Sequence, residues 1–164
     1  MPTFSFDIVS DYDKAEMNNV FAQVEKEIEN RYDFKNTPAA IEWLGDKKGF
    51  KLIGAGQWQI DSILDIIRKK LVTRNQTSKS LDLTKQPVES NLKVSWEVPF
   101  IAGLDQDKAK KITALLRDKV PKVKALIQGE AVRVTSGSKD DLQAAMREVE
   151  AADFDFSTQY TNYR

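Results

Sequence analysis

The sequence predicts an α+β protein of two similar domains, each a four-stranded antiparallel sheet with two helices on one face. The first observation is an internal repeat, because residues 41–71 and 123–153 share one apolar pattern at a constant offset of 82 residues. Ile41 matches Val123 and Phe50 matches Val132 without a gap. The second observation is that strand-like and helix-like patterns follow one another as βαββαβ in each half. This order is typical of the ferredoxin-like arrangement.

The elements of the first half follow from its periodicity. Phe4, Phe6 and Ile8 alternate with other residues, which is the pattern of a strand. A sequence similar to a capping box at 13–16 starts the following helix. Glycines at both ends of 45–49 indicate a hairpin turn between the next two strands. The predicted elements are a strand at 4–9, a helix at 13–32, strands at 41–44 and 50–53, a helix at 60–71 and a strand at 81–83.

The second half repeats the order. Val94, Trp96 and Val98 alternate, which predicts a strand with one apolar face. Pro121 cannot continue the helix before it, so that helix ends there. The predicted elements are a strand at 93–100, a helix carrying the stripe 109–116, strands at 123–127 and 132–134, a helix carrying the stripe 142–149 and a closing strand that begins at 154–156.

These elements predict a first ferredoxin-like domain at 1–86 and a second at 91–164, with a linker at 84–91 that contains Pro87. Half-chains of this size have thin cores, so we expect the two halves to pack on each other. Terminal strands can trade places between similar sheets. The strand at 4–9 could therefore complete either sheet, and the sequence leaves this choice open.

The register of the third strand decides which side chains face outward. The sequence at 48–53 is similar to an RNA-recognition motif, whose aromatic side chains stack on bases from the open sheet face. If Phe50 faced outward, Lys51 would point into the core, and burying that charge is costly. The second copy poses the same problem for Arg133. We therefore predict that Phe50 belongs to the core and that Lys51 and Arg133 lie on the open faces.

Four residues of these open faces are candidate contacts for the phosphate and base edge of a nucleotide, because their side chains carry cations or an amide. They are Lys51, Lys124, Gln128 and Arg133. Tyr163 and Arg164 are further candidates. The alternative is a solvated sheet face, or one that packs on the sister domain.

The composition excludes many kinds of chemistry. The chain has no histidine and no cysteine, so catalytic triads with histidine, thiol nucleophiles, disulfides and thiolate metal sites are excluded. We expect no enzyme, no catalytic residue, no metal and no cofactor, although carboxylate–magnesium chemistry at Asp153 and Asp155 needs neither residue type. The glycines of 54–56 are interpreted as a tight turn, because the dinucleotide fingerprint lacks its third glycine there.

Charge and hydropathy bear on partners and location. The chain has 25 basic and 25 acidic residues, which argues against nonspecific nucleic-acid binding driven by net charge. Residues 105–124 are nevertheless locally basic, which leaves open either an RNA- or tRNA-binding surface or a solvated face. No window is apolar enough to span a membrane, and no signal peptide is predicted at the N-terminus. We expect a cytoplasmic protein.

Several stretches resemble the YajQ family of small bacterial proteins. The longest is 122–134, followed closely by 139–143, and others are 5–10, 31–35 and 162–164. The resemblance covers essentially the whole chain and implies two ferredoxin-like domains without established catalysis. It also implies binding of a nucleotide, with cyclic di-GMP, GTP and ATP as candidates, or of RNA. A protein-interaction module without a small ligand is the third alternative.

Overall fold

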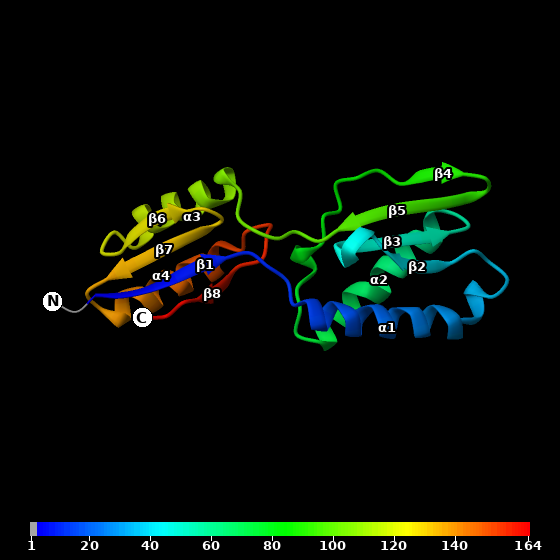
Figure 1. Ribbon diagram of the computed structural model, residues 1–164, viewed down its shortest axis with the longest axis horizontal. Coiled ribbons are helices and arrows are strands. Elements are labelled where there is room, and N and C mark those ends of the chain that lie inside the picture. Colours follow the sequence, from blue (N-terminus) through cyan, green and yellow to red (C-terminus); the bar gives the residue numbers. More distant parts are fainter. Residues whose placement is uncertain (1–2) are drawn as a thin grey trace. The chain divides into compact units, whose positions relative to one another are not determined.

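The computed structural model describes residues 3–164, which form two compact units (Figure 1). The central unit is Tyr12–Ile101. The terminal unit joins the first residues of the chain, up to Asp11, to Ala102–Arg164. Each unit has its own four-stranded antiparallel sheet and its own hydrophobic core. The predicted α+β class is confirmed.

The central unit holds the two helices and four strands between β1 and α3. Its elements are α1 (Lys14–Asn30), β2 (Ala40–Trp43), β3 (Gly49–Gly54), α2 (Gln57–Thr73), β4 (Val88–Ser90) and β5 (Lys93–Pro99), with 3-10 turns at Tyr32–Phe34, Gly45–Lys47 and Ser78–Ser80. The strand order is β2-β3-β5-β4. Asp13 caps α1 by accepting a hydrogen bond from the Glu16 backbone N–H at 3.1 Å, as the capping sequence predicts. Buried side chains of α1 and α2 pack against those of β2, β3 and β5.

The terminal unit combines both ends of the chain. Its elements are β1 (Phe4–Val9), α3 (Gln106–Lys119), β6 (Lys124–Gln128), β7 (Ala131–Ser136), α4 (Lys139–Ala152) and β8 (Gln159–Thr161). The strand order is β6-β7-β1-β8, and all three neighbouring pairs are antiparallel. Phe6 and Ile8 of β1 are fully buried against the apolar stripes of α3 and α4. Read as β1-α3-β6-β7-α4-β8, this unit has the ferredoxin-like βαββαβ order.

The internal repeat is visible in the element bounds. β3 begins at Gly49 and β7 at Ala131, and α2 begins at Gln57 and α4 at Lys139, so both pairs keep the offset of 82 residues. The register that the charges predict is also confirmed. Phe50, Leu52, Val132 and Val134 are fully buried, whereas Lys51 and Arg133 lie on the opposite faces of their strands.

The two units divide the chain differently from the predicted ranges 1–86 and 91–164. β1 pairs with β7 in the terminal unit, which is one of the two placements that the sequence left open. β5, from the second half, pairs with β3 in the central unit. The two strands thus occupy equivalent positions in each other's sheet. Both have one apolar and one polar face, so either sheet can accept either strand.

Two predicted strands are corrected. Residues 81–83 form no strand but a single bridge between Leu81 and Phe100, and the edge strand of the central unit is β4, inside the predicted linker. β4 turns into β5 through Asn91 and Leu92, whose φ angles of 51° and 64° suit a two-residue hairpin turn. The closing strand does not begin at 154–156 either. Phe156 is buried in the core, and β8 starts only at Gln159.

No helix within residues 3–164 is both long enough and apolar enough to cross a membrane.

Candidate functional site

Lys51 is the only predicted site residue in the central unit. On the open face of its sheet, Lys51 lies opposite Glu42 of β2 and Glu97 of β5 in the strand register. Opposite charges on neighbouring strands stabilise each other. Glu97 also pairs with Lys85 at 3.2 Å. Lys51 is therefore part of an alternating array of charges, in which its ammonium group already has acidic neighbours.

Arg133, on β7 of the terminal unit, forms a two-pronged ion pair with Asp7 of β1. The Arg133 Nε donates to Asp7 Oδ1 at 2.9 Å, and a second guanidinium nitrogen donates to Oδ2 at 3.3 Å. Asn162 Nδ2 donates to the same Oδ2 at 2.9 Å. The hydrogen bonds from Arg133 lower the pKa of Asp7 from its ordinary value, against the opposing effect of burial. Asp7 thus links Arg133 of β7 to Asn162, just after β8.

Lys124 and Gln128 lie on β6, at the edge of the same sheet. Both side chains are exposed, and Leu126 between them is directly opposite Arg133. Residues spaced by two along a strand share a face, so Lys124 and Gln128 lie on the open face with Arg133. The structure brings these three together as the sequence predicts.

Tyr163 and Arg164 follow β8 and run beside β1. The backbones of Ser5 and Arg164 exchange two hydrogen bonds, of 3.1 Å and 2.9 Å. The Tyr163 ring stacks on the ring of Phe6 with centroids 6.2 Å apart and an interplanar angle of 26°. This segment therefore continues the pairing of β8 along β1 and places Tyr163 beside the core.

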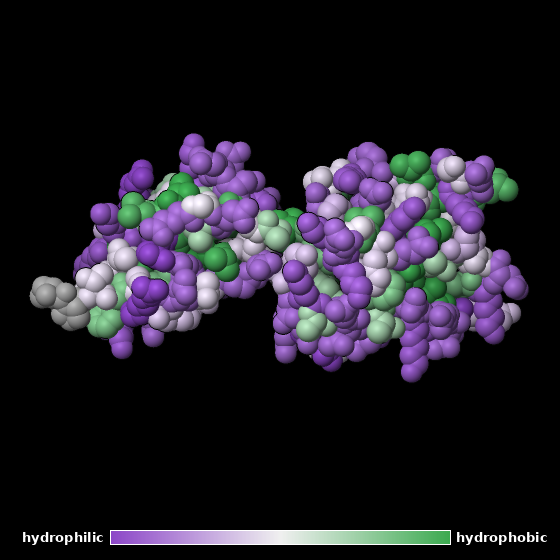
Figure 2. Space-filling view, in the orientation of Figure 1, coloured by the Kyte–Doolittle hydropathy of each residue, from purple (hydrophilic) through white to green (hydrophobic). Residues whose placement is uncertain are grey.

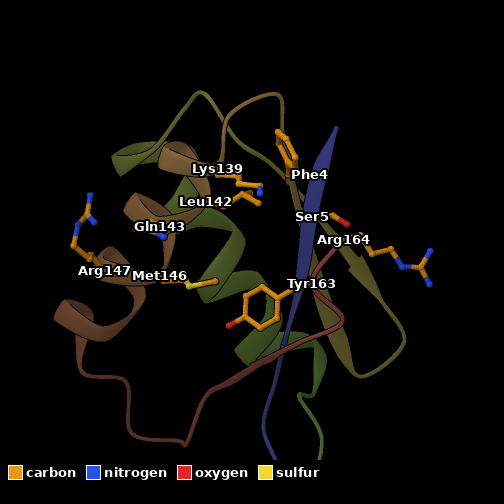
Figure 3. Close-up of a pocket in the computed structure, with 9 residues that line it drawn as sticks. All are labelled: Phe4, Ser5, Lys139, Leu142, Gln143, Met146, Arg147, Tyr163 and Arg164. Atoms are coloured by element: carbon orange, nitrogen blue, oxygen red, sulfur yellow. The ribbon is translucent and has the colours of Figure 1, made fainter. Parts of the chain in front are cut away.

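A groove of about 600 Å³ opens between this segment and α4 (Figure 3). We call it the α4 groove. It is lined by Phe4, Ser5, Lys139, Leu142, Gln143, Met146, Arg147, Tyr163 and Arg164. In Figure 3 the aromatic rings come from β1 and the C-terminal segment, and the aliphatic and cationic side chains come mostly from α4. The Lys139 ammonium lies 5.1 Å from the centre of the Phe4 ring, a cation–π distance.

The groove combines the two kinds of surface that bind a flat, charged ligand. Phe4 and Tyr163 provide aromatic area, and Leu142 and Met146 extend it with aliphatic carbon. Lys139, Gln143 and Arg147 add two cations and an amide. They are spaced by four residues, which places them on one face of α4. No acidic residue is among the residues that line the groove.

Of the residues that line this groove, the sequence predicts only Tyr163 and Arg164 as nucleotide contacts. It places Leu142 and Met146 in a core stripe instead, which Leu142 confirms, since it is 6% exposed. The 139-143-147 spacing of polar residues was the available signal, but its importance depends on where β1 lies. Phe4 reaches the groove only because β1 joins the terminal unit.

Asp105 and the glycine turn at 54–56 both have local structural roles. Asp105 accepts a hydrogen bond from the Lys108 backbone N–H at 2.8 Å and so caps α3, as expected for an acidic residue at a helix start. At 54–56, the Gln59 side-chain oxygen accepts the Ala55 N–H at 2.6 Å, so a side chain of the protein fills this turn. Within residues 3–164 no group of three or more acidic side chains could hold a metal ion.

This chain is similar to known proteins over nearly its whole length. A family model described as nucleotide-binding protein YajQ-like matches residues 4–164. A protein of Trichodesmium erythraeum named nucleotide-binding protein is 41% identical over 162 residues, which are 99% of this chain and 98% of that protein. A protein of Streptomyces griseus with the same name is 41% identical over 165 residues and is covered completely, as is this chain. A third, from Chloroherpeton thalassium, is 40% identical over 162 residues, with 99% and 98% covered.

Proposed function

Because the chain belongs to the YajQ-like family, we propose that it binds a nucleotide, without catalysing a reaction, in the α4 groove of the terminal unit. The observation that carries this proposal is the pairing of two aromatic rings, Phe4 and Tyr163, with cations in a groove that no acidic residue lines. Aromatic rings stack on a base of any identity, and cations bind phosphate. The relatives named above are called nucleotide-binding proteins, which agrees with this chemistry.

Within the groove, each part of a nucleotide has a partner. The base would stack on the ring of Tyr163, a residue that is 63% exposed, and its edge would meet the Gln143 amide. The phosphates would lie toward Lys139 and Arg147, whose side chains are exposed on α4. Cyclic di-GMP, GTP and ATP are the nucleotides to test. All three combine a purine with phosphate, and the groove alone does not select among them.

We expect Tyr163→Ala to weaken nucleotide binding about 5- to 150-fold, because stacking of a base on an aromatic ring contributes about 1–3 kcal/mol. Arg147→Gln should weaken it about tenfold through loss of a charge-assisted hydrogen bond. The measurement is calorimetric titration with cyclic di-GMP, GTP and ATP, supported by the thermal stabilisation that a bound ligand produces.

The matched control is Arg117→Gln, which removes another exposed arginine from α3 of the same unit, outside the groove. If Arg117→Gln and Arg147→Gln weaken binding equally, the groove is not the site. Lys124→Ala and Gln128→Ala test the open sheet face in the same titration. A larger loss in these two variants than in Tyr163→Ala would move the site to that face.

A second candidate function rests on the basic segment at the surface of the terminal unit. Lys110, Lys111, Arg117 and Lys119 of α3 are all exposed, as are Lys122 and Lys124 after it. If this surface binds tRNA, retention should fall steeply between about 50 and 200 mM salt, because each phosphate contact releases counterions. A double Lys110→Gln/Lys111→Gln variant should then bind less tRNA and show a shallower salt slope. A flat salt response in the unmodified protein contradicts this candidate.

A further inference from the structure

The outer edge of β6 is a free sheet edge with unusual exposed apolar side chains. Within residues 3–164 no strand pairs with this edge, because β6 is the first strand in the order β6-β7-β1-β8. Leu126 is 47% exposed and Ile127 is 37% exposed. Figure 2 shows hydrophobic atoms interrupting the hydrophilic surface where β6 and β7 lie in Figure 1.

Proteins normally keep free edges short or charged, so that they do not pair with other chains. The other edge strands are shorter, since β8 and β4 have 3 residues each and β2 has 4, although the segment after β8 makes a further backbone pair between Arg164 and Ser5. β6 has 5 residues, and Lys124 is its only charged one. Of these four edges, β6 is thus the longest and carries little charge to prevent pairing.

The hairpin between β6 and β7 shows which backbone groups of β6 are available. Its two-residue turn at Gly129 and Glu130 joins Gln128 to Ala131, and such a turn closes on a hydrogen-bonded pair. Hydrogen-bonded and non-hydrogen-bonded pairs alternate along an antiparallel ladder. Leu126 therefore bonds to β7. Ala125 and Ile127 direct their N–H and C=O groups toward the free edge.

We propose that β6 pairs with β6 of a second copy of this chain, antiparallel and about a two-fold axis at Leu126. In this register Ala125 bonds through both backbone groups to Ile127 of the second copy, and these are the groups that the hairpin leaves free. Leu126 meets Leu126 of the second copy in a non-hydrogen-bonded pair, where side chains approach most closely. The exposed apolar side chains of the edge become covered.

Charge complementarity favours a second copy of this chain as the partner that pairs with the free edge of β6. In the same register Lys124 lies opposite Gln128 of the second copy, so the two lysines do not oppose each other. Just beyond the strand ends, Lys122 and Glu130 of the second copy have opposite charges. A two-fold interface between identical chains requires a strand that is complementary to its own antiparallel copy, and β6 meets this requirement. The pairing joins two four-stranded sheets into one. Because a five-residue edge buries little area, the dimer is a concentration-dependent one.

Cysteine substitution tests the register directly, because the chain contains no cysteine of its own. Leu126→Cys places two thiols opposite each other with Cα atoms about 4.5 Å apart, within the range of about 4.4–6.8 Å that a disulfide needs. Under mild oxidation it should form a covalent dimer of twice 18.6 kDa at least ten times faster than the two controls. Lys124→Cys is one control, because its two thiols would lie about 14 Å apart along the strands. Leu92→Cys, at a 97% exposed position of the central unit, is the other.

The unmodified protein gives an independent test by sedimentation equilibrium. Its weight-average mass should rise above 18.6 kDa with concentration, whereas Leu126→Lys, which opposes two charges, should stay at 18.6 kDa. Leu92→Lys should behave as the unmodified protein. Equal cross-linking rates in the three cysteine variants overturn the proposal. So does a mass that stays at 18.6 kDa in the unmodified protein up to about 1 mM, since the free energy of such an association would be below about 4 kcal/mol.

Discussion

Replacing Phe50 with alanine is expected to destabilise the central unit by about 3–5 kcal/mol, the usual cost of truncating a fully buried phenylalanine. Phe50 is 0% exposed and lies at the centre of an aromatic cluster. Its ring centre is 4.8 Å from that of Phe100, 5.3 Å from that of Trp43 and 6.1 Å from that of Phe21. Alanine leaves a cavity among rings that are held by α1, by β2 and by the residue that follows β5.

Tryptophan fluorescence measures this effect in one unit alone. All three tryptophans, at 43, 58 and 96, belong to the central unit, so urea unfolding followed by their emission reports that unit. The control is Lys51→Ala, one residue along β3 on the opposite face, which should change the free energy of unfolding by less than about 0.5 kcal/mol. A loss of unfolding free energy in Lys51→Ala comparable to that in Phe50→Ala would contradict the register of β3.

This register could be predicted because charge makes a wrong choice costly. Lys51 and Arg133 each stand between two apolar residues, so turning the strand over would bury a cation in both copies. The strand exchange could not be predicted in the same way. β1 and β5 have equivalent patterns, and nothing local distinguishes their destinations. β4 was missed for a different reason. Its three residues are all exposed, so they leave no alternation of burial in the sequence.

The candidate site could be predicted only in part, for the same reason. Lys124 and Arg133 lie on one open face, as the sequence predicts, but the sequence leaves open which sheet β1 completes and therefore where Asp7 lies. Its ion pair with Arg133 follows only once β1 lies beside β7. The α4 groove depends on the same exchange, because Phe4 lies on β1 and Tyr163 follows β8. Local patterns therefore predict which face a side chain occupies, whereas a site assembled from both chain ends requires the topology.

Replacing Arg133 with alanine should destabilise the terminal unit by about 1–3 kcal/mol at pH 7, because it leaves a buried carboxylate without its ionic partner. The Asp7 side chain is 10% exposed, whereas that of Arg133 is 35% exposed, so the carboxylate loses more than the guanidinium would. Asn162 remains as a single amide donor to Asp7. Amide hydrogen exchange of β1 and β7 measures the effect, since it reads the terminal unit separately from the tryptophans. The control Arg117→Ala removes an exposed arginine from α3 of the same unit and should change this exchange little.

The pH dependence of this loss identifies Asp7 as its origin. In the unmodified protein the pKa of Asp7 lies below its ordinary value of 3.8, chiefly because Arg133 donates to the ionised form. A depressed folded-state pKa stabilises the fold above the ordinary value, and this stabilisation is lost as pH falls through the folded-state pKa. Without Arg133 the largest of the effects that lower the pKa of Asp7 is lost, so ionisation of Asp7 stabilises the variant less. The difference in stability between Arg133→Ala and the unmodified protein should therefore shrink as the pH is lowered from 7 to below 3.8, with the change falling between 3.8 and the folded-state pKa of Asp7. Asp7→Asn in the Arg133→Ala background should recover stability at pH 7, because it removes the unpaired charge. A difference that stays constant over this range would show that the loss comes from packing of the arginine side chain.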